Sequence, residues 1–259
     1  MHTTKDKLTL AVEVGSLMLT SGAEVYRVSE TIKHICHGLG LDDFDVYVLT
    51  NGIFASAYES QEDACSVVRN ITNIDFHLGK VSALNQLSRD IYNGVLDYDG
   101  AMKEFALIKE IKTTATYKLI LFCGLGCSAF TFLFGGSLVD ALVSFLNGLI
   151  LGGFLYKIKG NKFIRNIFGA FIVSFIAMIA SLLFKGISYN MIVIGSLMPL
   201  VPGIALTTGV RDLFYGDYLS GAIKMLEALL TGLSIAVGVG TLMTLINFLK
   251  EIHIWSFHF

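Results

Sequence analysis

The chain has 259 residues, of which 54% are hydrophobic and 15% are charged, and its mean hydropathy of +0.66 excludes an ordinary soluble protein. The charge is divided unevenly, with a net charge of −6 over residues 1–116 and +4 over residues 117–259. Neither part is rich in Lys and Arg clusters, which excludes a nucleic-acid partner. The composition predicts an acidic, hydrophilic domain over residues 1–116 and a membrane domain over residues 117–259.

Two helices are expected at the start of the chain. Apolar residues fill most of Leu8–Leu19, which predicts a largely buried helix. Ser21 and Glu24, with Gly22 and Ala23 between them, match a capping box that starts a second helix over about Ala23–Leu39. The apolar residues of that helix repeat every three or four positions, so they indicate a face turned to the core and not a cofactor site.

A small sheet and two more helices complete the first domain. Alternating apolar residues predict strands over Phe44–Leu49, Ile53–Tyr58 and Ala64–Ile71, with a turn at Asn51-Gly52. Helices are predicted over Leu78–Tyr92 and Tyr98–Ile111. These elements give an α+β domain, which residues 109–118 join to the membrane domain.

The first residues and the cysteines indicate a cytoplasmic domain without a cofactor. Residues 1–15 lack the long apolar core and cleavage site of a signal peptide, so we expect this domain to stay in the cytoplasm. Cys36, Cys65, Cys123 and Cys127 lack the paired spacing of a metal site, and we expect them to form no disulfide. His34 and His37 lie three residues apart on a helix, but no clear third metal ligand accompanies them.

Five transmembrane helices are predicted in the second domain. Between Lys118 and Lys157 the only charge is Asp140, and a split at residues 135–137 gives two spans with Asp140 at a turn or helix start. The other three spans are predicted over residues 166–184, 190–209 and 225–249. The loop 157–165 carries four basic residues and no acid, so it is expected inside the cell. An odd number of spans then puts the C-terminus outside, with Trp255 at the membrane interface.

The fourth span contains the only two prolines of the chain, Pro199 and Pro202, followed by Gly203. Proline lacks the amide hydrogen of a helix interior, so the helix is expected to break between Met198 and Gly203. Unpaired backbone groups within a membrane must be covered by protein or must line a wet cavity. The break therefore indicates either a site that binds substrate, as in transporters with discontinuous helices, or a simple kink packed against a neighbour.

Three stretches resemble the threonine/serine exporter family. They are GSLMLTSGAEVYRVSETI (residues 15–32), DVYVLTNGIFAS (residues 45–56) and PLVPGIALTTGVRDLFYGDYLSGAIKMLEALL (residues 199–230). The chain is most similar to the larger subunit of the two-component form, whose partner is a small membrane subunit. The resemblance implies a multi-pass protein of the cell membrane. It also implies export of threonine and serine, or of a dicarboxylate such as succinate, driven by the proton gradient.

Candidate transport residues lie in and near the membrane spans. Pro199, Pro202 and Gly203 expose backbone groups, and Thr207 and Thr208 add hydroxyls that suit a zwitterion or a carboxylate. Arg211 either attracts the substrate carboxylate or contacts lipid headgroups or Asp212. Asp140 and Glu227 are candidates for proton coupling, against the alternative that they are exposed acids at helix ends.

The first domain admits two further hypotheses. It is either an accessory hydrolase or a regulatory and assembly module, in which Glu24, Tyr26 and Arg27 orient it against the membrane loops. The sequence lacks a G-x-S-x-G nucleophile motif and an H-E-x-x-H metal motif, and a cap explains Ser21 better than catalysis does. Because one half of an inverted transporter has no opposing gate, we expect a partner of about five spans or, alternatively, a homo-oligomer.

Overall fold

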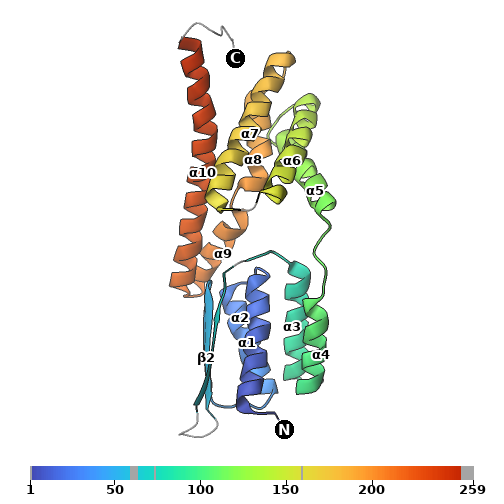
Figure 1. Cartoon of the computed structure of the whole chain (residues 1–259), viewed down its shortest axis with the longest axis vertical. Helices are drawn as coiled ribbons and strands as arrows, with labels where there is room; N and C mark the ends of the chain where they lie inside the picture. Colours follow the sequence, from blue (N-terminus) through green and yellow to red (C-terminus); the bar gives the residue numbers. More distant parts are fainter. Residues whose placement is uncertain (1, 59–63, 73, 159, 252–259) are drawn as a thin grey trace. The chain divides into compact units, whose positions relative to one another are not determined.

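The computed structural model describes residues 2–58, 64–72, 74–158 and 160–251 (Figure 1). Contacts divide the chain into two compact units. Unit 1 contains Met1–Thr113 together with Thr207–Met225, and unit 2 contains Thr114–Leu206 together with Leu226–Phe259. The segment 207–225, which contains most of α9 and the start of α10, is thus packed with the N-terminal elements.

Unit 1 contains four helices and three strands from the N-terminal part of the chain. They are α1 (Thr4–Thr20), α2 (Val25–Gly38), β1 (Phe44–Leu49), β2 (Gly52–Tyr58), β3 (Ala64–Asn70), α3 (Leu78–Tyr92) and α4 (Tyr98–Lys109). The strands form an antiparallel sheet in the order β1-β2-β3, which confirms the predicted small sheet. Figure 1 shows the sheet on one side of α1 and α2, with α3 and α4 on the other side. This sandwiched position explains why α1 is apolar around most of its circumference.

The predicted capping box at Ser21 and Glu24 is wrong. Ser21 ends α1, where its amide donates to the carbonyl of Leu17, and Glu24 precedes α2 without a capping bond from its side chain. The reason is the turn between the helices. Gly22 has φ +87°, and a Cβ there would lie 2.4 Å from the Phe76 ring, so only glycine fits. This turn ends α1 after Ser21 and delays the start of α2 to Val25.

Unit 2 contains the apolar helices of the chain. They are α5 (Thr116–Leu133), α6 (Leu138–Lys157), α7 (Lys162–Leu183), α8 (Tyr189–Leu197), the 3₁₀ turn η1 (Met198–Leu200) and parts of α9 (Gly203–Phe214) and α10 (Tyr218–Glu251). In the described part of the chain, four helices are long and apolar enough to cross a membrane: α5, α6, α7 and α10. A fifth span is present if the bent pair of α8–η1 with α9 counts as one. The expected interfacial Trp255 lies outside the described residues.

Gly148 and Gly152, four residues apart on α6, form a close contact with α5. A Cβ on Gly148 of α6 would lie 2.8 Å from the Cα of Gly124 and 2.7 Å from the Cys127 sulfur on α5. A Cβ on Gly152 would lie 3.2 Å from Cys123 Cβ. Small residues let two membrane helices approach this closely, and here they hold α5 and α6 together.

Candidate functional site

The break predicted at the two prolines is present. After α8, η1 spans Met198–Leu200, Val201 is extended with ψ 130°, and α9 begins at Gly203. The residue before a proline avoids the helical region, and Pro202 cannot donate an amide hydrogen, so the helix cannot continue through Val201. The two helical segments are bent by 56°. The backbone is partly reconnected by bonds from Val201 N to Met198 O and from Leu206 N to Pro202 O.

The residues of the break differ in burial. Leu200 is buried against Leu151 and Ala170 in the core of unit 2, whereas Pro199, Gly203 and Thr207 are exposed on this chain. Thr208 is half-buried. Leu200 therefore packs the break against the core of unit 2, whereas Pro199, Gly203 and Thr207 lie on the surface of this chain.

Unit 2 also buries a set of small polar side chains that the sequence analysis missed. Five of those that are fully inaccessible belong to helices α5 to α8: Thr131, Ser144, Asn147, Ser174 and Ser196. The Thr131 hydroxyl donates to Ser144 Oγ at 2.7 Å, and Asn147 Nδ2 donates to the Val173 carbonyl at 3.0 Å. Among the described residues, Asn147 Oδ1 and Ser196 Oγ have no hydrogen-bond partner.

These five residues form what we call the buried polar cluster. A Cβ on Gly195 of α8 would lie 2.0 Å from Thr131 Oγ1, so α5 and α8 are in direct contact beside it. These side chains are uncharged, so the pattern of charged residues in the sequence does not reveal them. The available signal is the spacing of Asp140, Ser144 and Asn147, which places three polar residues on one face of α6.

Asp140 caps α6 and is not an exposed acid. Ser137 donates to Asp140 Oδ2 from its amide and from its hydroxyl, both at 2.8 Å, and the Ser188 amide donates to Oδ1 at 2.9 Å. The carboxylate is only 2% exposed. It therefore ties the turn before α6 to the segment before α8. Glu227 is more open and pairs with Lys162, with 2.6 Å between Oε1 and Nζ.

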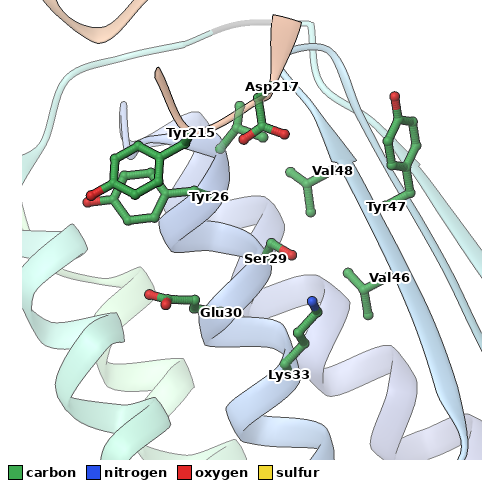
Figure 2. Close-up of a pocket in the computed structure, with 10 residues that line it drawn as sticks. Tyr26, Ser29, Glu30, Lys33, Val46, Tyr47, Val48, Tyr215 and Asp217 are labelled. Carbon is green, nitrogen blue, oxygen red and sulfur yellow. The ribbon is translucent and has the colours of Figure 1, made fainter. Parts of the chain in front are cut away.

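An aromatic stack connects α2 to the end of α9 within unit 1. The rings of Tyr26 and Tyr215 lie with their centroids 4.3 Å apart and their planes 13° apart (Figure 2). Tyr26 belongs to the family-like motif at the start of α2, and Tyr215 follows the last residue of α9. The stack thus joins two segments that are almost 190 residues apart in the sequence.

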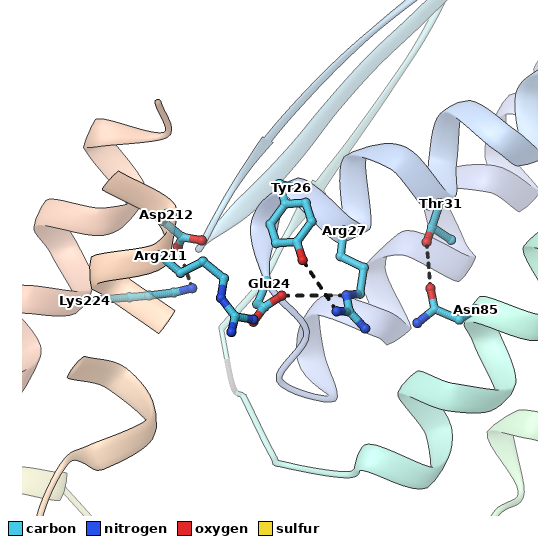
Figure 3. Close-up of polar contacts among 8 residues, drawn as sticks. All are labelled: Glu24, Tyr26, Arg27, Thr31, Asn85, Arg211, Asp212 and Lys224. Carbon is cyan, nitrogen blue, oxygen red and sulfur yellow. Dashed lines mark hydrogen bonds and ion pairs between the residues drawn. The ribbon is translucent and has the colours of Figure 1, made fainter. Parts of the chain in front are cut away.

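Charged residues lie near Tyr26 (Figure 3). Glu24 forms an ion pair with Arg211 of α9 and lies 3.6 Å from Arg27. A hydrogen bond to Tyr26, 3.5 Å from the guanidinium, raises the pKa of Arg27. The N-terminal motif includes five candidate residues: Ser21, Gly22, Glu24, Tyr26 and Arg27. Glu24 and Tyr26 contact α9 and the turn after it, whereas Arg27 contacts Glu24 and Tyr26. We call Glu24, Tyr26 and Arg27, with Arg211, Tyr215 and the neighbouring pair Asp212–Lys224, the junction cluster.

The other two motif residues, Ser21 and Gly22, lie at the end of α1. There the Ser21 carbonyl accepts a bond from the His77 amide.

The junction cluster also contains a buried ion pair. Asp212 is fully buried, and its Oδ2 lies 2.7 Å from the ammonium of Lys224 on α10, whose side chain is 13% exposed. Arg211, for which Asp212 was one alternative partner, pairs with Glu24 in the structure, and Asp212 pairs with Lys224. Arg211 and Asp212 are adjacent on α9, so their side chains point in different directions and take different partners.

The histidines and cysteines have structural surroundings. His34 packs against Tyr92 and His37 against Phe44, with ring centroids 5.0 and 4.9 Å apart. All four cysteines are free thiols, and burial raises the pKa of Cys36 to about 12. Within the described ranges, no three His, Cys, Asp or Glu side chains are grouped so that they could hold a metal ion.

Comparison with known proteins matches nearly the whole chain to one family. Residues 9–246 match the family described as "Putative threonine/serine exporter". A Klebsiella aerogenes protein named "Probable succinate transporter subunit YjjP" is 24% identical over 91% of this chain and 92% of its own length. The "Probable threonine/serine exporter" of Mycobacterium tuberculosis is 24% identical over 92% of this chain but only 46% of its own length. No solved structure matches the chain.

Proposed function

The chain belongs to the threonine/serine exporter family, and from this premise we propose that it is the larger subunit of a proton-coupled exporter of small amino acids or of a related small carboxylate. The chain is a multi-pass membrane protein of a transporter family. The subunit role, the substrate and the coupling to protons are proposed. In the proposed arrangement, five spans cross the cell membrane, the domain 1–116 is cytoplasmic and the C-terminus is outside.

The broken span is the observation that carries the proposal. Discontinuous helices in transporters expose backbone donors and acceptors to substrate near the middle of the membrane. We propose that Pro199, Pro202 and Gly203 provide such backbone, and that Thr207, Thr208 and Arg211 continue the substrate route along α9. We propose that the buried polar cluster of unit 2 also serves the substrate route, because polar groups within a membrane protein commonly mark the path of substrates and ions.

Two observations support a partner subunit: the exposure of residues at the break, and the names and lengths of the relatives. Pro199, Gly203 and Thr207 are exposed on this chain, and irregular backbone is not tolerated against lipid. The Klebsiella relative is named a subunit, and the Mycobacterium relative has about twice the length of the region it shares with this chain. We propose that a small membrane subunit of about five spans covers the break, with further copies of this chain as the alternative.

The N-terminal domain is proposed to control the broken span and not to catalyse a reaction. The junction cluster supports this role, because α9 runs without interruption from Gly203 to Arg211, which pairs with Glu24, and Tyr215 directly after α9 stacks on Tyr26. The hydrolase alternative receives no such support. Ser21 is 4% exposed and its backbone is bonded within unit 1, so it is poorly placed as a nucleophile.

Reconstitution tests the proposed function directly. The chain is placed in liposomes with and without the candidate partner, and fluxes of threonine, serine and succinate are measured under an imposed proton gradient. We expect partner-dependent flux of one of these substrates. The double variant Pro199→Ala with Pro202→Ala should insert normally but export poorly, because the regained amide donors straighten the span. Normal export by that variant at equal abundance, or full transport by a demonstrated monomer, would contradict the proposal.

A further inference from the structure

A cavity of about 430 Å³ lies in unit 1 beside the aromatic stack (Figure 2). Its walls come from three elements: the first half of α2, the strand β1, and the turn between α9 and α10. Cavities of this size commonly hold small ligands. The stacked rings of Tyr26 and Tyr215 form part of its wall. A ligand in the cavity therefore touches both α2 and the α9–α10 turn.

The charges of the cavity are arranged along its length. Figure 2 shows Asp217, from the α9–α10 turn, at one end, the ammonium of Lys33 toward the other, and the Ser29 hydroxyl between them. Glu30 provides a second carboxylate in the lining. Burial raises the pKa of Asp217, and the nearby Asp212 carboxylate raises it further, while Lys224 partly offsets the effect. A ligand ammonium beside Asp217 would favour the charged form of this carboxyl group.

We propose that this cavity binds a small zwitterionic amino acid as a regulatory site, with the ligand carboxylate on Lys33 and the ligand ammonium on Asp217. Lys33 offers a cation to the ligand carboxylate, Asp217 offers an anion to the ligand ammonium, and Ser29 can bond a ligand hydroxyl or carboxylate. A dicarboxylate would meet one cation and two carboxylates, so the cavity disfavours it. The bound ligand joins α2 to the α9–α10 turn and thereby favours the state in which the two are in contact.

The site is distinct from the transport route that begins at the broken span. Asp217 lies beyond the end of α9, and Lys33 and Ser29 belong to the N-terminal domain. Only the choice of threonine as a probe rests on the proposed function. The regulatory site and the exporter activity can therefore fail independently, provided that the experiment locates the bound ligand in the chain.

Amide hydrogen exchange of the full-length chain in nanodiscs provides this location. Threonine at ten times its dissociation constant should slow exchange about tenfold in peptides that cover residues 25–33 and 214–220, where exchange requires release of the ligand. Succinate at the same concentration should give little protection. Lys33→Gln and Asp217→Asn should each weaken threonine binding by at least about tenfold. Lys103→Gln and Asp42→Asn, at exposed positions outside the cavity lining, are the matched controls.

Each outcome has a separate meaning. Protection of these peptides that is lost in Lys33→Gln supports the site, whether or not the reconstituted protein exports threonine. Threonine flux without protection of these peptides overturns the site and leaves the exporter proposal standing. Equal protection by ethylamine, which has the ammonium but not the carboxylate, overturns the assignment of a zwitterion. Equal protection by succinate, which has carboxylates but no ammonium, also overturns the assignment of a zwitterion.

Discussion

The two units differ in the polar contacts that join their segments. In unit 1 these contacts include two ion pairs, Glu24 with Arg211 and Asp212 with Lys224. In unit 2 most buried polar groups are neutral hydroxyls and amides, such as Thr131, Ser144 and Asn147, and they bond to one another or to backbone. A charged side chain within a membrane is costly unless hydrogen bonds or an opposite charge stabilise it. The Asp140 carboxylate is stabilised by three hydrogen bonds that it accepts.

The comparison indicates different uses for the two kinds of group. Charged pairs fix the position of the segment after the broken span, where water can reach part of the surface. Neutral polar groups are tolerated between membrane helices at low cost and can still offer hydrogen bonds to a substrate. Changes in unit 1 charges should therefore act mainly on stability and assembly, and changes in the buried polar cluster mainly on transport.

The largest expected effect is on the buried ion pair. Asp212→Asn leaves the Lys224 ammonium in a buried site without its counter-charge, which typically costs about 3–5 kcal/mol. The free energy of unfolding, measured in mixed micelles, should fall by that amount. The matched control is Glu227→Gln, which breaks the more exposed pair with Lys162 and should cost about 0–1 kcal/mol. Equal losses in the two variants would show that burial does not set the strength of these pairs.

A smaller effect is expected from the contact between α5 and α6. Gly148→Ala places a methyl group 2.7–2.9 Å from atoms of α5, and such overpacking costs about 1–3 kcal/mol. Gly153 lies on the same helix, and a methyl group there would meet no neighbouring atom within 4 Å, so Gly153→Ala should be neutral or slightly stabilising. The same unfolding measurement checks both. Equal stability of the two variants would mean that α5 and α6 are not packed this closely.

The buried polar cluster is tested by transport and not by stability. Asn147→Leu removes the bond to Val173 but also removes the unpartnered Oδ1, so stability should change by less than about 1 kcal/mol. Flux should fall by about tenfold if Asn147 faces the substrate route. Asn190→Ala, at an exposed position of α8, is the control and should leave flux unchanged. Wild-type flux in Asn147→Leu would show that Asn147 contributes to helix packing and not to transport.

Local features of the structure could be predicted from the sequence, and partners distant in sequence could not. The strands, the helices α3 and α4 and the break at Pro199 and Pro202 follow from patterns of a few residues. The capping box at Ser21 was misplaced because Gly22 turns the chain within it. The capping boxes of the structure are at Thr3 with Asp6 and at Ser137 with Asp140.

The candidate site divides in the same way. The motif residues Glu24, Tyr26 and Arg27 stood out in the sequence, but no local pattern indicates that Glu24 pairs with Arg211 or that Tyr26 stacks on Tyr215. Those contacts depend on how the chain folds back over almost 190 residues. Asn147 was overlooked because an uncharged residue in an apolar span leaves the hydropathy pattern nearly unchanged.

The smallest expected effect decides between two roles of Arg211. If it positions α9 through Glu24, then Glu24→Gln and Arg211→Gln should each reduce maximal flux a few-fold, and the double variant should lose little more than either single variant. The coupling energy of a partly exposed pair is about 0.5–1 kcal/mol, so the effect is small but measurable. If Arg211 instead binds the substrate carboxylate, only Arg211→Gln should raise KM, and the effects of the two substitutions should add. Kinetics of the four proteins at equal membrane abundance separate these cases. The control, Arg69→Gln, breaks an ion pair of similar exposure with Glu13 elsewhere in unit 1 and should leave both parameters unchanged.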